Sequence, residues 1–210
     1  MTDFRNYRAD NFPPVVKNLI IVNVVVFIAQ LGLDASFNLT YKLALHPVSS
    51  PEFRAYQVIT HMFTHSPAGF MHILFNMFGL WMFGKLLENL WGPKRFLNFY
   101  LLCGIGAAIV HLIVESITGG SGWAVGASGA IMGIFAAFGY LFPNTELFIM
   151  FIPIPVKAKW AVLGLAAYDL FGGIAKSGGD NVAHFAHLGG ALTGFIIVLI
   201  WNKKGRGRFY

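Results

Sequence analysis

Six apolar stretches with polar connections between them constrain the fold of this chain more than any other feature. A helix needs about 20 apolar residues to cross roughly 30 Å of hydrocarbon. The stretches cover residues 18–33, 71–90, 96–117, 128–142, 158–174 and 182–201, to within a few residues at each end. They lack the alternation of apolar and polar residues that a membrane β-barrel would require. The sequence therefore predicts an all-α membrane protein with six transmembrane helices.

Composition excludes two other classes of protein. Charged residues make up 11% of the 210 residues and hydrophobic residues 56%, whereas an ordinary soluble domain carries about 25% charged residues. A disordered chain is poor in apolar and aromatic residues, but this chain has 21 phenylalanines. Its single cysteine, Cys103, excludes an internal disulfide.

The basic residues predict the orientation in the membrane. If both termini are cytoplasmic, 12 of the 15 basic residues fall on the inner side, as the positive-inside rule requires. We therefore expect one membrane domain over 1–210, with a cytoplasmic N-terminal segment 1–17 and a basic cytoplasmic tail 203–210. The net charge of +6 indicates attraction to the lipid bilayer. The basic residues are dispersed among the connections, which argues against nucleic acid as a partner.

The fourth apolar stretch is short and follows unusual connections. Residues 34–68 form a long external first loop, and 119–127 are too rich in glycine for a stable helix. The stretch 128–142 has only 15 residues, so its helix would cover about 22 Å. Irregular backbone at membrane depth is tolerated only inside protein or beside a watery cavity. We therefore predict a submerged fourth helix beginning at a cavity that opens to the outside.

Ser128 lies at this predicted helix start, in the run Gly126-Ala127-Ser128-Gly129. The free N–H groups of a helix start can stabilise an oxyanion, so the position suits a nucleophilic serine. A serine that only caps the helix is the alternative.

His187 lies near the outer end of the last stretch, within reach of the same place. Gly190 and Gly194 are four residues apart, as are Gly129 and Gly133 in the fourth stretch. Small residues at this spacing let membrane helices pack backbone to backbone. If these faces meet, the histidine could take the proton of the serine hydroxyl. An interfacial histidine without chemistry remains the alternative.

His72 and Asn76 share one helix face in the second stretch, because they are four residues apart. Both side chains can donate hydrogen bonds to the oxygen of a tetrahedral intermediate. Hydrogen bonding between helices, which is common for asparagine in membranes, is the alternative.

Together these residues resemble the rhomboid intramembrane serine proteases, in their bacterial-type, six-span form. The resemblance runs over residues 15–202. It is carried by His72-x-x-x-Asn76, Gly84-x-x-x-Glu88-x-x-x-Gly92, Gly126-x-Ser128-Gly129 and Ala186-His187-x-Gly189-Gly190 with Gly194, in this order on the expected helices.

The resemblance implies a role for each motif residue. Ser128 would be the nucleophile and His187 the general base, and His72, Asn76 and the Ser128 backbone N–H would form the oxyanion hole. Glu88 would tie the second and third helices together. The resemblance also implies structural roles for Gly84, Glu88, Gly92, Gly126, Gly129, Gly190 and Gly194.

The resemblance further implies what the protein acts on and where. It implies cleavage of transmembrane protein substrates through an acyl-enzyme, with no cofactor and no metal. We expect a multi-pass protein of the bacterial plasma membrane. The sequence differs from many relatives at Tyr56-Gln57, where a Trp-Arg pair is common, and at Met132, where an aromatic residue is common.

Other chemistries fit the sequence less well. A zinc protease would need His-Glu-x-x-His, which does not occur in the sequence. An aspartyl dyad would need two carboxylates at similar depth, and Asp169 and Asp180 are poorly spaced for one. We expect Asp169 to bond to a neighbouring span or loop instead. A polytopic transporter and a non-proteolytic relative that binds membrane proteins remain as alternatives, although no internal repeat supports the transporter.

Overall fold

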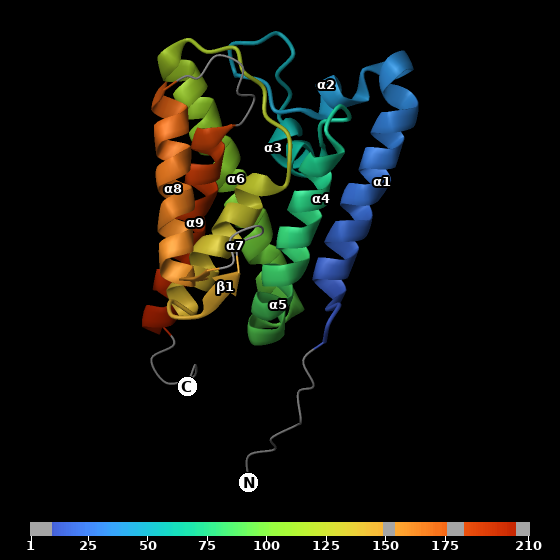
Figure 1. Cartoon of the computed structure of the whole chain (residues 1–210). Coiled ribbons are helices and arrows are strands. Elements are labelled where there is room, and N and C mark those ends of the chain that lie inside the picture. The colour runs from blue at the N-terminus through green and yellow to red at the C-terminus, as the bar shows by residue number, and fades with distance from the viewer. Residues whose placement is uncertain (1–9, 149–153, 176–182, 205–210) are drawn as a thin grey trace.

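The computed structural model of the chain describes residues 10–148, 154–175 and 183–204. These residues form a bundle of helices around a central one, α7 (Figure 1). The other main helices of the bundle are α1 (Pro14–Phe37), α4 (Phe70–Gly79), α5 (Lys85–Trp91), α6 (Pro93–Thr118), α8 (Ala158–Ala175) and α9 (His184–Lys204), and α7 is Ser128–Leu141. The predicted all-α fold is confirmed.

Shorter elements connect the main helices. A π-helical segment, η2 (Leu80–Gly84), joins α4 to α5 so that 70–91 form one continuous helical rod. The first long connection contains α2 (Leu39–Leu43), α3 (Gln57–Thr60) and the 3₁₀ turn η1 (His61–Phe63). Between α7 and α8, β1 (Glu146–Phe148) pairs antiparallel with β2 (Pro155–Lys157).

All six predicted stretches are helical, with ends that differ by a few residues. Four helices are long and apolar enough to cross a membrane, namely α1, the rod 70–91, α6 and α9, and α7 is a shorter apolar helix. The number of six membrane crossings therefore stays a prediction. Residues 1–9, 176–182 and 205–210, and with them most of the two predicted cytoplasmic segments, Gly178-Gly179-Asp180 and the start of the sixth stretch at 182, lie outside the described residues.

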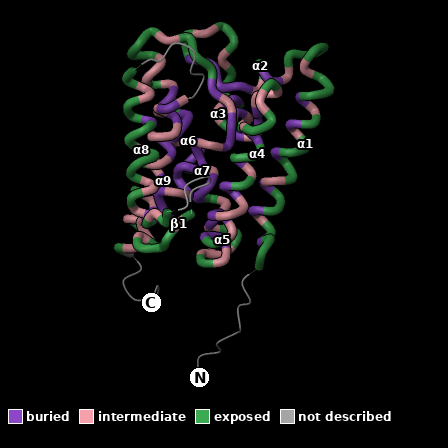
Figure 2. The backbone as a smooth tube through the Cα atoms, in the orientation of Figure 1, coloured by how far each residue is buried: buried purple, intermediate pink, exposed green. Residues whose placement is uncertain are grey.

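The central helix α7 is buried along most of its length (Figure 2). It packs against α9 through the glycines that the sequence singled out. A Cβ atom added at Gly190 would overlap the carbonyl oxygen of Gly129, and one added at Gly194 would lie 2.6 Å from the Cα of Gly133. The predicted backbone-to-backbone contact of these two helices is therefore confirmed.

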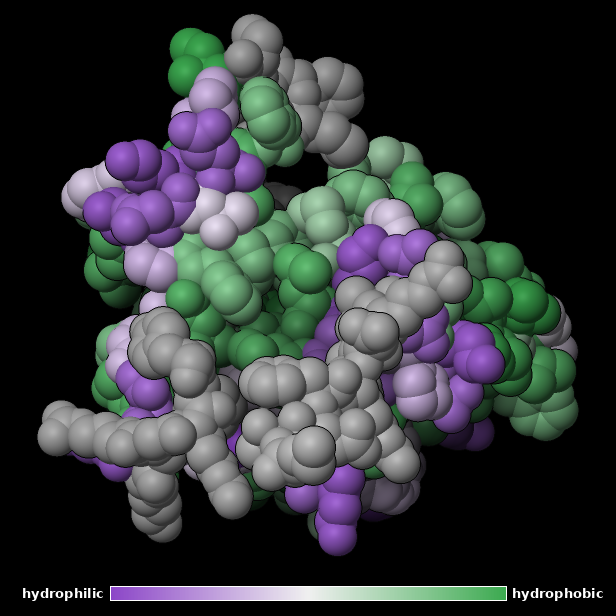
Figure 3. All heavy atoms as spheres, turned by 90° about the horizontal axis from the view of Figure 1, so that it is seen from below, coloured by the Kyte–Doolittle hydropathy of each residue, from purple (hydrophilic) through white to green (hydrophobic). Residues whose placement is uncertain are grey.

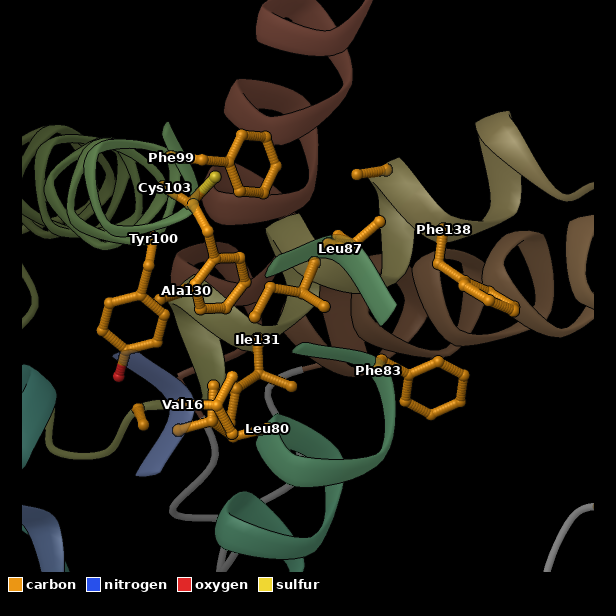
Figure 4. Close-up of a cluster of buried hydrophobic side chains, with 14 of the residues drawn as sticks. Val16, Leu80, Phe83, Leu87, Phe99, Tyr100, Cys103, Ala130, Ile131 and Phe138 are labelled. Carbon is orange, nitrogen blue, oxygen red and sulfur yellow. The ribbon is translucent and has the colours of Figure 1, made fainter. Parts of the chain in front are cut away.

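A core of large side chains fills the space between α1, η2, α5, α6 and α7 (Figure 4). Phe99 and Tyr100 of α6 are fully buried there, together with Leu80 of η2 and Leu87 of α5. Val16 brings the first turn of α1 into the same cluster. This core holds the end of the bundle at which α1 begins.

The outer faces of the bundle are apolar. On α1, Val25, Ile28 and Leu31 are exposed, and on α8 so are Trp160 and Phe171. In the view from the end at which α1 begins, hydrophobic side chains cover the flank on the right and hydrophilic side chains gather in clusters at that end (Figure 3). Exposed apolar surface of this extent needs a covering. The chain is accordingly a multi-pass membrane protein whose flanks face lipid.

Glu88 binds α1, which corrects the expected tie between the second and third helices. Its two carboxylate oxygens accept hydrogen bonds from the backbone N–H groups of Val15 and Val16, at 2.9 and 2.8 Å. Helix α1 begins with Pro14, which has no N–H, so the next two N–H groups are the ones that lack partners within the helix. A carboxylate satisfies both and interacts favourably with the helix dipole.

Buried amide side chains fix the external first loop. Gln30 of α1 donates to Thr40 Oγ1 and to the His65 carbonyl, and its own oxygen accepts from the His65 N–H. Gln57 donates to the carbonyls of Lys42 and Glu52. Gln57 is thus an anchor of this loop.

Candidate active site

Ser128 is the first residue of α7, and its hydroxyl lies 2.8 Å from Nε2 of His187. The capping position belongs to Ala127, which makes no side-chain cap, and the hydroxyl is directed to the histidine instead. Gly126 has a φ of +119°, a backbone conformation that residues other than glycine rarely adopt. This glycine therefore allows the chain to turn into α7 with Ser128 at its start.

His187 lies in the first turn of α9 and uses both of its ring nitrogens. Nε2 contacts Ser128, and Nδ1 lies 3.0 Å from Oδ1 of Asp169 on α8. An ionised carboxylate can only accept hydrogen bonds, so Nδ1 carries the proton of the neutral ring. The lone pair of Nε2 then faces the serine hydroxyl, which is the arrangement a general base requires.

Asp169 also binds His184, one turn before His187 on α9. The Nδ1 of His184 lies 2.8 Å from the same Oδ1, and the side chains of both partners are 5% exposed. The expected bond from Asp169 to a neighbouring span is present. The second bond of Asp169, to His187, was not predicted from the sequence. The signal for it was an aspartate in an apolar helix together with a His-x-x-His spacing on the next helix.

A cavity of about 930 Å³ opens beside the Ser128–His187 pair. It lies among α4, α6, α7, α8 and α9 and the loop that precedes α7. Polar residues on its wall include Ser66, His72, His111, Glu115, Ser128 and His187. The predicted cavity at the start of the fourth helix is therefore present.

His72 lines the cavity, whereas Asn76 is not among its lining residues in the described part of the chain. Nδ1 of His72 accepts a long hydrogen bond, 3.5 Å, from the Ser66 N–H, so the ring proton is on Nε2. That Nε2 lies 2.9 Å from where a Cβ of Gly126 would be. Asn76 instead donates from Nδ2 to the His72 carbonyl at 2.7 Å. The structure thus brings Ser128, His187 and His72 together at the cavity, whereas Asn76 bonds to the backbone of His72.

Two further histidines support the loop beside the site. His61 bonds through Nδ1 to the Gln57 carbonyl at 2.9 Å, and its own carbonyl accepts from the Gly126 N–H. Burial lowers the pKa of His61 to about 4, and burial together with the nearby His72 does the same for His65. Both side chains are therefore neutral at physiological pH, and His61 connects the first loop to the turn that precedes Ser128.

The fold and the site together define a class of protein. It is a multi-pass helical membrane protein with a serine–histidine pair at a cavity between its helices. The model of the Rhomboid domain family matches residues 52–204, and the chain belongs to the rhomboid family. It is 34% identical over 157 residues to the presenilin-associated rhomboid-like protein A of Danio rerio, covering 72% of this chain and 40% of that protein.

Two relatives match over nearly the whole chain. RHOMBOID-like protein 12 of Arabidopsis thaliana is 30% identical over 210 residues, covering 93% of this chain and 60% of that protein. Rhomboid protein 1 of Saccharomyces cerevisiae is 31% identical over 203 residues, covering 90% of this chain and 57% of that protein. The chain thus spans between two fifths and three fifths of the length of these relatives.

The expected localisation is wrong. All three relatives are named as mitochondrial proteins, which points away from a bacterial plasma membrane. The assignment of the two ends to a bacterial cytoplasm is overturned with it. The multi-pass membrane character is retained.

Proposed function

We propose that this chain is an intramembrane serine endopeptidase that cleaves transmembrane segments through Ser128 and His187. One observation carries the proposal, the 2.8 Å contact between Ser128 Oγ and His187 Nε2 at the wall of a cavity in a protein of this family. A serine is a weak nucleophile until a neighbouring base takes its proton. A histidine held at this distance can do so.

The acylation step follows from the geometry of the pair. His187 Nε2 accepts the hydroxyl proton while Ser128 Oγ attacks the carbonyl carbon of the scissile bond, and a tetrahedral intermediate forms. His187 then gives the same proton to the departing amine as the C–N bond breaks. The substrate remains as an ester on Ser128.

The negative oxygen of the intermediate needs donors that are fixed in advance. The Ser128 N–H is one of the first N–H groups of α7, which lack partners within the helix. His72 offers its Nε2 proton from the cavity wall. Asn76 uses one Nδ2 proton for the His72 carbonyl and has a second for a supporting bond.

Hydrolysis of the ester requires water inside the bundle. A water molecule occupies about 30 Å³ of liquid, so a cavity of about 930 Å³ holds several of them beside the ester. His187 takes a proton from one water, the resulting hydroxide attacks the ester carbonyl, and the proton passes to Ser128 Oγ as the bond breaks. The free enzyme is regenerated.

The substrates we propose are transmembrane segments that unwind near the cut, because a fully hydrogen-bonded helix hides its carbonyls. Small or helix-breaking residues would ease that unwinding. Residues 1–210 would act as one membrane domain, with its partners reached through the lipid bilayer. In the bundle the first turn of α1 and the last turn of α9 lie at the same end (Figure 1), which supports placing both flanking segments on one side of the membrane.

A fluorophosphonate probe tests the proposal directly. The probe forms a bond between phosphorus and an activated serine oxygen and releases fluoride. We expect the native protein to be labelled and the Ser128→Ala variant to be unlabelled and unable to cut a transmembrane peptide. The Ser121→Ala variant removes another serine of the same cavity and should be labelled normally. Equal labelling of native protein and Ser128→Ala would overturn the proposal, and solute transport by the Ser128→Ala protein would favour a transporter.

A further inference from the structure

We infer that Asp169 of α8 is a positioning residue for His187, an inference that rests on the proposed function. The contact that carries it is the 3.0 Å distance between Asp169 Oδ1 and His187 Nδ1, opposite the nitrogen that faces Ser128. Serine, histidine and aspartate thus form one chain of hydrogen bonds across three helices, α7, α9 and α8. The reacting pair is extended by a third group.

The carboxylate acts on the imidazole in two ways. It fixes the neutral ring with its proton on Nδ1, so that Nε2 is free to accept the proton of the serine. It also stabilises the positive charge that the ring acquires when it takes that proton. Asp169 keeps its own charge throughout and receives no proton.

Burying the carboxylate of Asp169 costs free energy unless hydrogen-bond partners compensate for it. The residue is buried on α8 between residues whose side chains are exposed on the apolar flank, Tyr168 and Leu170. A charged side chain at membrane depth is expensive and faces the interior of the bundle or a watery cavity. Here both partners are imidazoles on the first turn of α9, His184 and His187.

His184 holds the carboxylate in place without contacting the serine in the described structure. Its Nδ1 bonds to the same oxygen at 2.8 Å, and its ring packs so closely on α8 that a Cβ added at Gly172 would lie 2.6 Å from it. If Asp169 only held α8 and α9 together, its bond to His184 would be enough. The second bond, to the ring that faces Ser128, is the one that assigns a chemical role to Asp169.

Several polar and titratable groups besides Asp169 lie near His187, so a pH test must account for them. These are Ser128 on α7, His184 on α9, His72 on α4, which faces His187, and His111 and Glu115 on the α6 wall of the cavity. Among the described residues, Asp169 and Ser128 are the two that bond to the ring of His187. A variant at Asp169 changes one of these groups and leaves the rest.

The experiment compares Asp169→Asn with His184→Ala, which removes the other bond to the same carboxylate. We expect Asp169→Asn to lower kcat for a transmembrane peptide by about 10²–10⁴, because loss of the orienting aspartate costs about 10⁴ in soluble serine proteases. KM should change by less than about twofold, because Asp169 is outside the described cavity lining. His184→Ala should retain at least about a tenth of the native kcat.

The pH profile separates this role from a structural one. Without the negative charge the imidazolium is harder to form, so the acid limb of labelling by the fluorophosphonate should move to lower pH in Asp169→Asn and stay in place in His184→Ala. A kcat for Asp169→Asn within about threefold of native, or equal losses in both variants with unmoved acid limbs, would overturn the inference. If the native protein itself is not labelled, the proposed function fails instead.

Discussion

Two buried carboxylates at opposite ends of the bundle make the same number of bonds and serve different purposes. Glu88, near the start of α1, accepts two backbone N–H groups, and Asp169, near the start of α9, accepts two imidazole N–H groups. Both are almost fully buried. Burial and a pair of hydrogen bonds therefore do not identify a functional carboxylate. The chemistry of the donors does, because a backbone amide is fixed in its protonation state and an imidazole is not.

The packing around the two carboxylates also differs. Glu88 follows Leu87 and bonds to Val16, and both of these residues belong to a core of packed aromatic and aliphatic side chains (Figure 4). Asp169 bonds to His184 and His187, which line a cavity that also contains Ser128. A filled core holds a helix end in place, whereas a cavity admits a substrate and water. One end of the bundle is thus built for rigidity, and we propose that the other is built for reaction.

The largest effect is expected for a substitution of His187. Replacing His187 with alanine removes the proposed base, so kcat should fall by at least about 10³. The apparent melting temperature should stay within a few degrees of native, since the glycine contacts between α7 and α9 are untouched. Cleavage of a transmembrane peptide and thermal unfolding in detergent measure the two quantities. A variant that remained active would remove the distinction between the two ends.

The oxyanion donors should give the next largest effect. Loss of one such donor in a serine protease costs about 10²–10³ in rate. We expect this loss in kcat for His72→Ala, since His72 lines the cavity. Asn76→Ala should lose about tenfold or less, since its amide bonds to the His72 carbonyl. The reverse order, measured with the same peptide, would mean that Asn76 and not His72 contacts the intermediate.

Acid should destabilise the folded protein through two buried histidines of the first loop, His61 and His65. His61 and His65 have a pKa of about 4 in the folded protein, because they are buried, and an ordinary value of about 6.5 when unfolded. The unfolded chain therefore binds more protons between these values, and stability is lost as pH falls from about 6.5 to about 4. Each histidine contributes about 3 kcal/mol to that loss.

Melting temperatures measured between pH 7 and pH 4 would test this expectation. The variant His61→Asn keeps a donor for the Gln57 carbonyl but cannot be protonated, so its melting temperature should fall less steeply with acid. An unchanged slope in this variant would mean that other groups cause the acid sensitivity.

The sequence predicted the parts of the site that depend on local patterns. The start of α7 at Ser128, the glycine pairs that bring α7 against α9, and the contact of Ser128 with His187 all follow from residues that occur in short motifs. Each motif fixes one helix face or one helix end. Two such faces can be matched from sequence because small residues need a partner surface of the same kind.

The sequence did not predict the particular partners of side chains on helices whose rotation is unknown. Asp169 was expected to bond to a neighbouring span or loop, but the sequence does not state which residue it meets there, and His187 lies 18 positions further along the chain. Glu88 was assigned to the wrong neighbour for the same reason, since its partners are backbone groups that carry no sequence signal. The π-helical segment η2 was also missed, because it shifts the helix face by one residue without a proline or glycine cluster to mark it.

A substitution of Glu88 should have the smallest effect. Glutamine in place of Glu88 keeps one acceptor oxygen and places an amide against the second N–H group, so one of the two bonds to α1 is lost. The cost is about 1–3 kcal/mol, as for a buried donor left without a partner, and the melting temperature should fall by several degrees. The matched variant Glu115→Gln changes an acidic residue at the cavity wall and should leave the melting temperature nearly unchanged.

Activity per folded molecule of Glu88→Gln should equal that of the native protein, because no reacting group is touched. A loss of kcat without a loss of stability would show that this end of the bundle also takes part in the reaction, and the contrast between the two carboxylates would no longer hold.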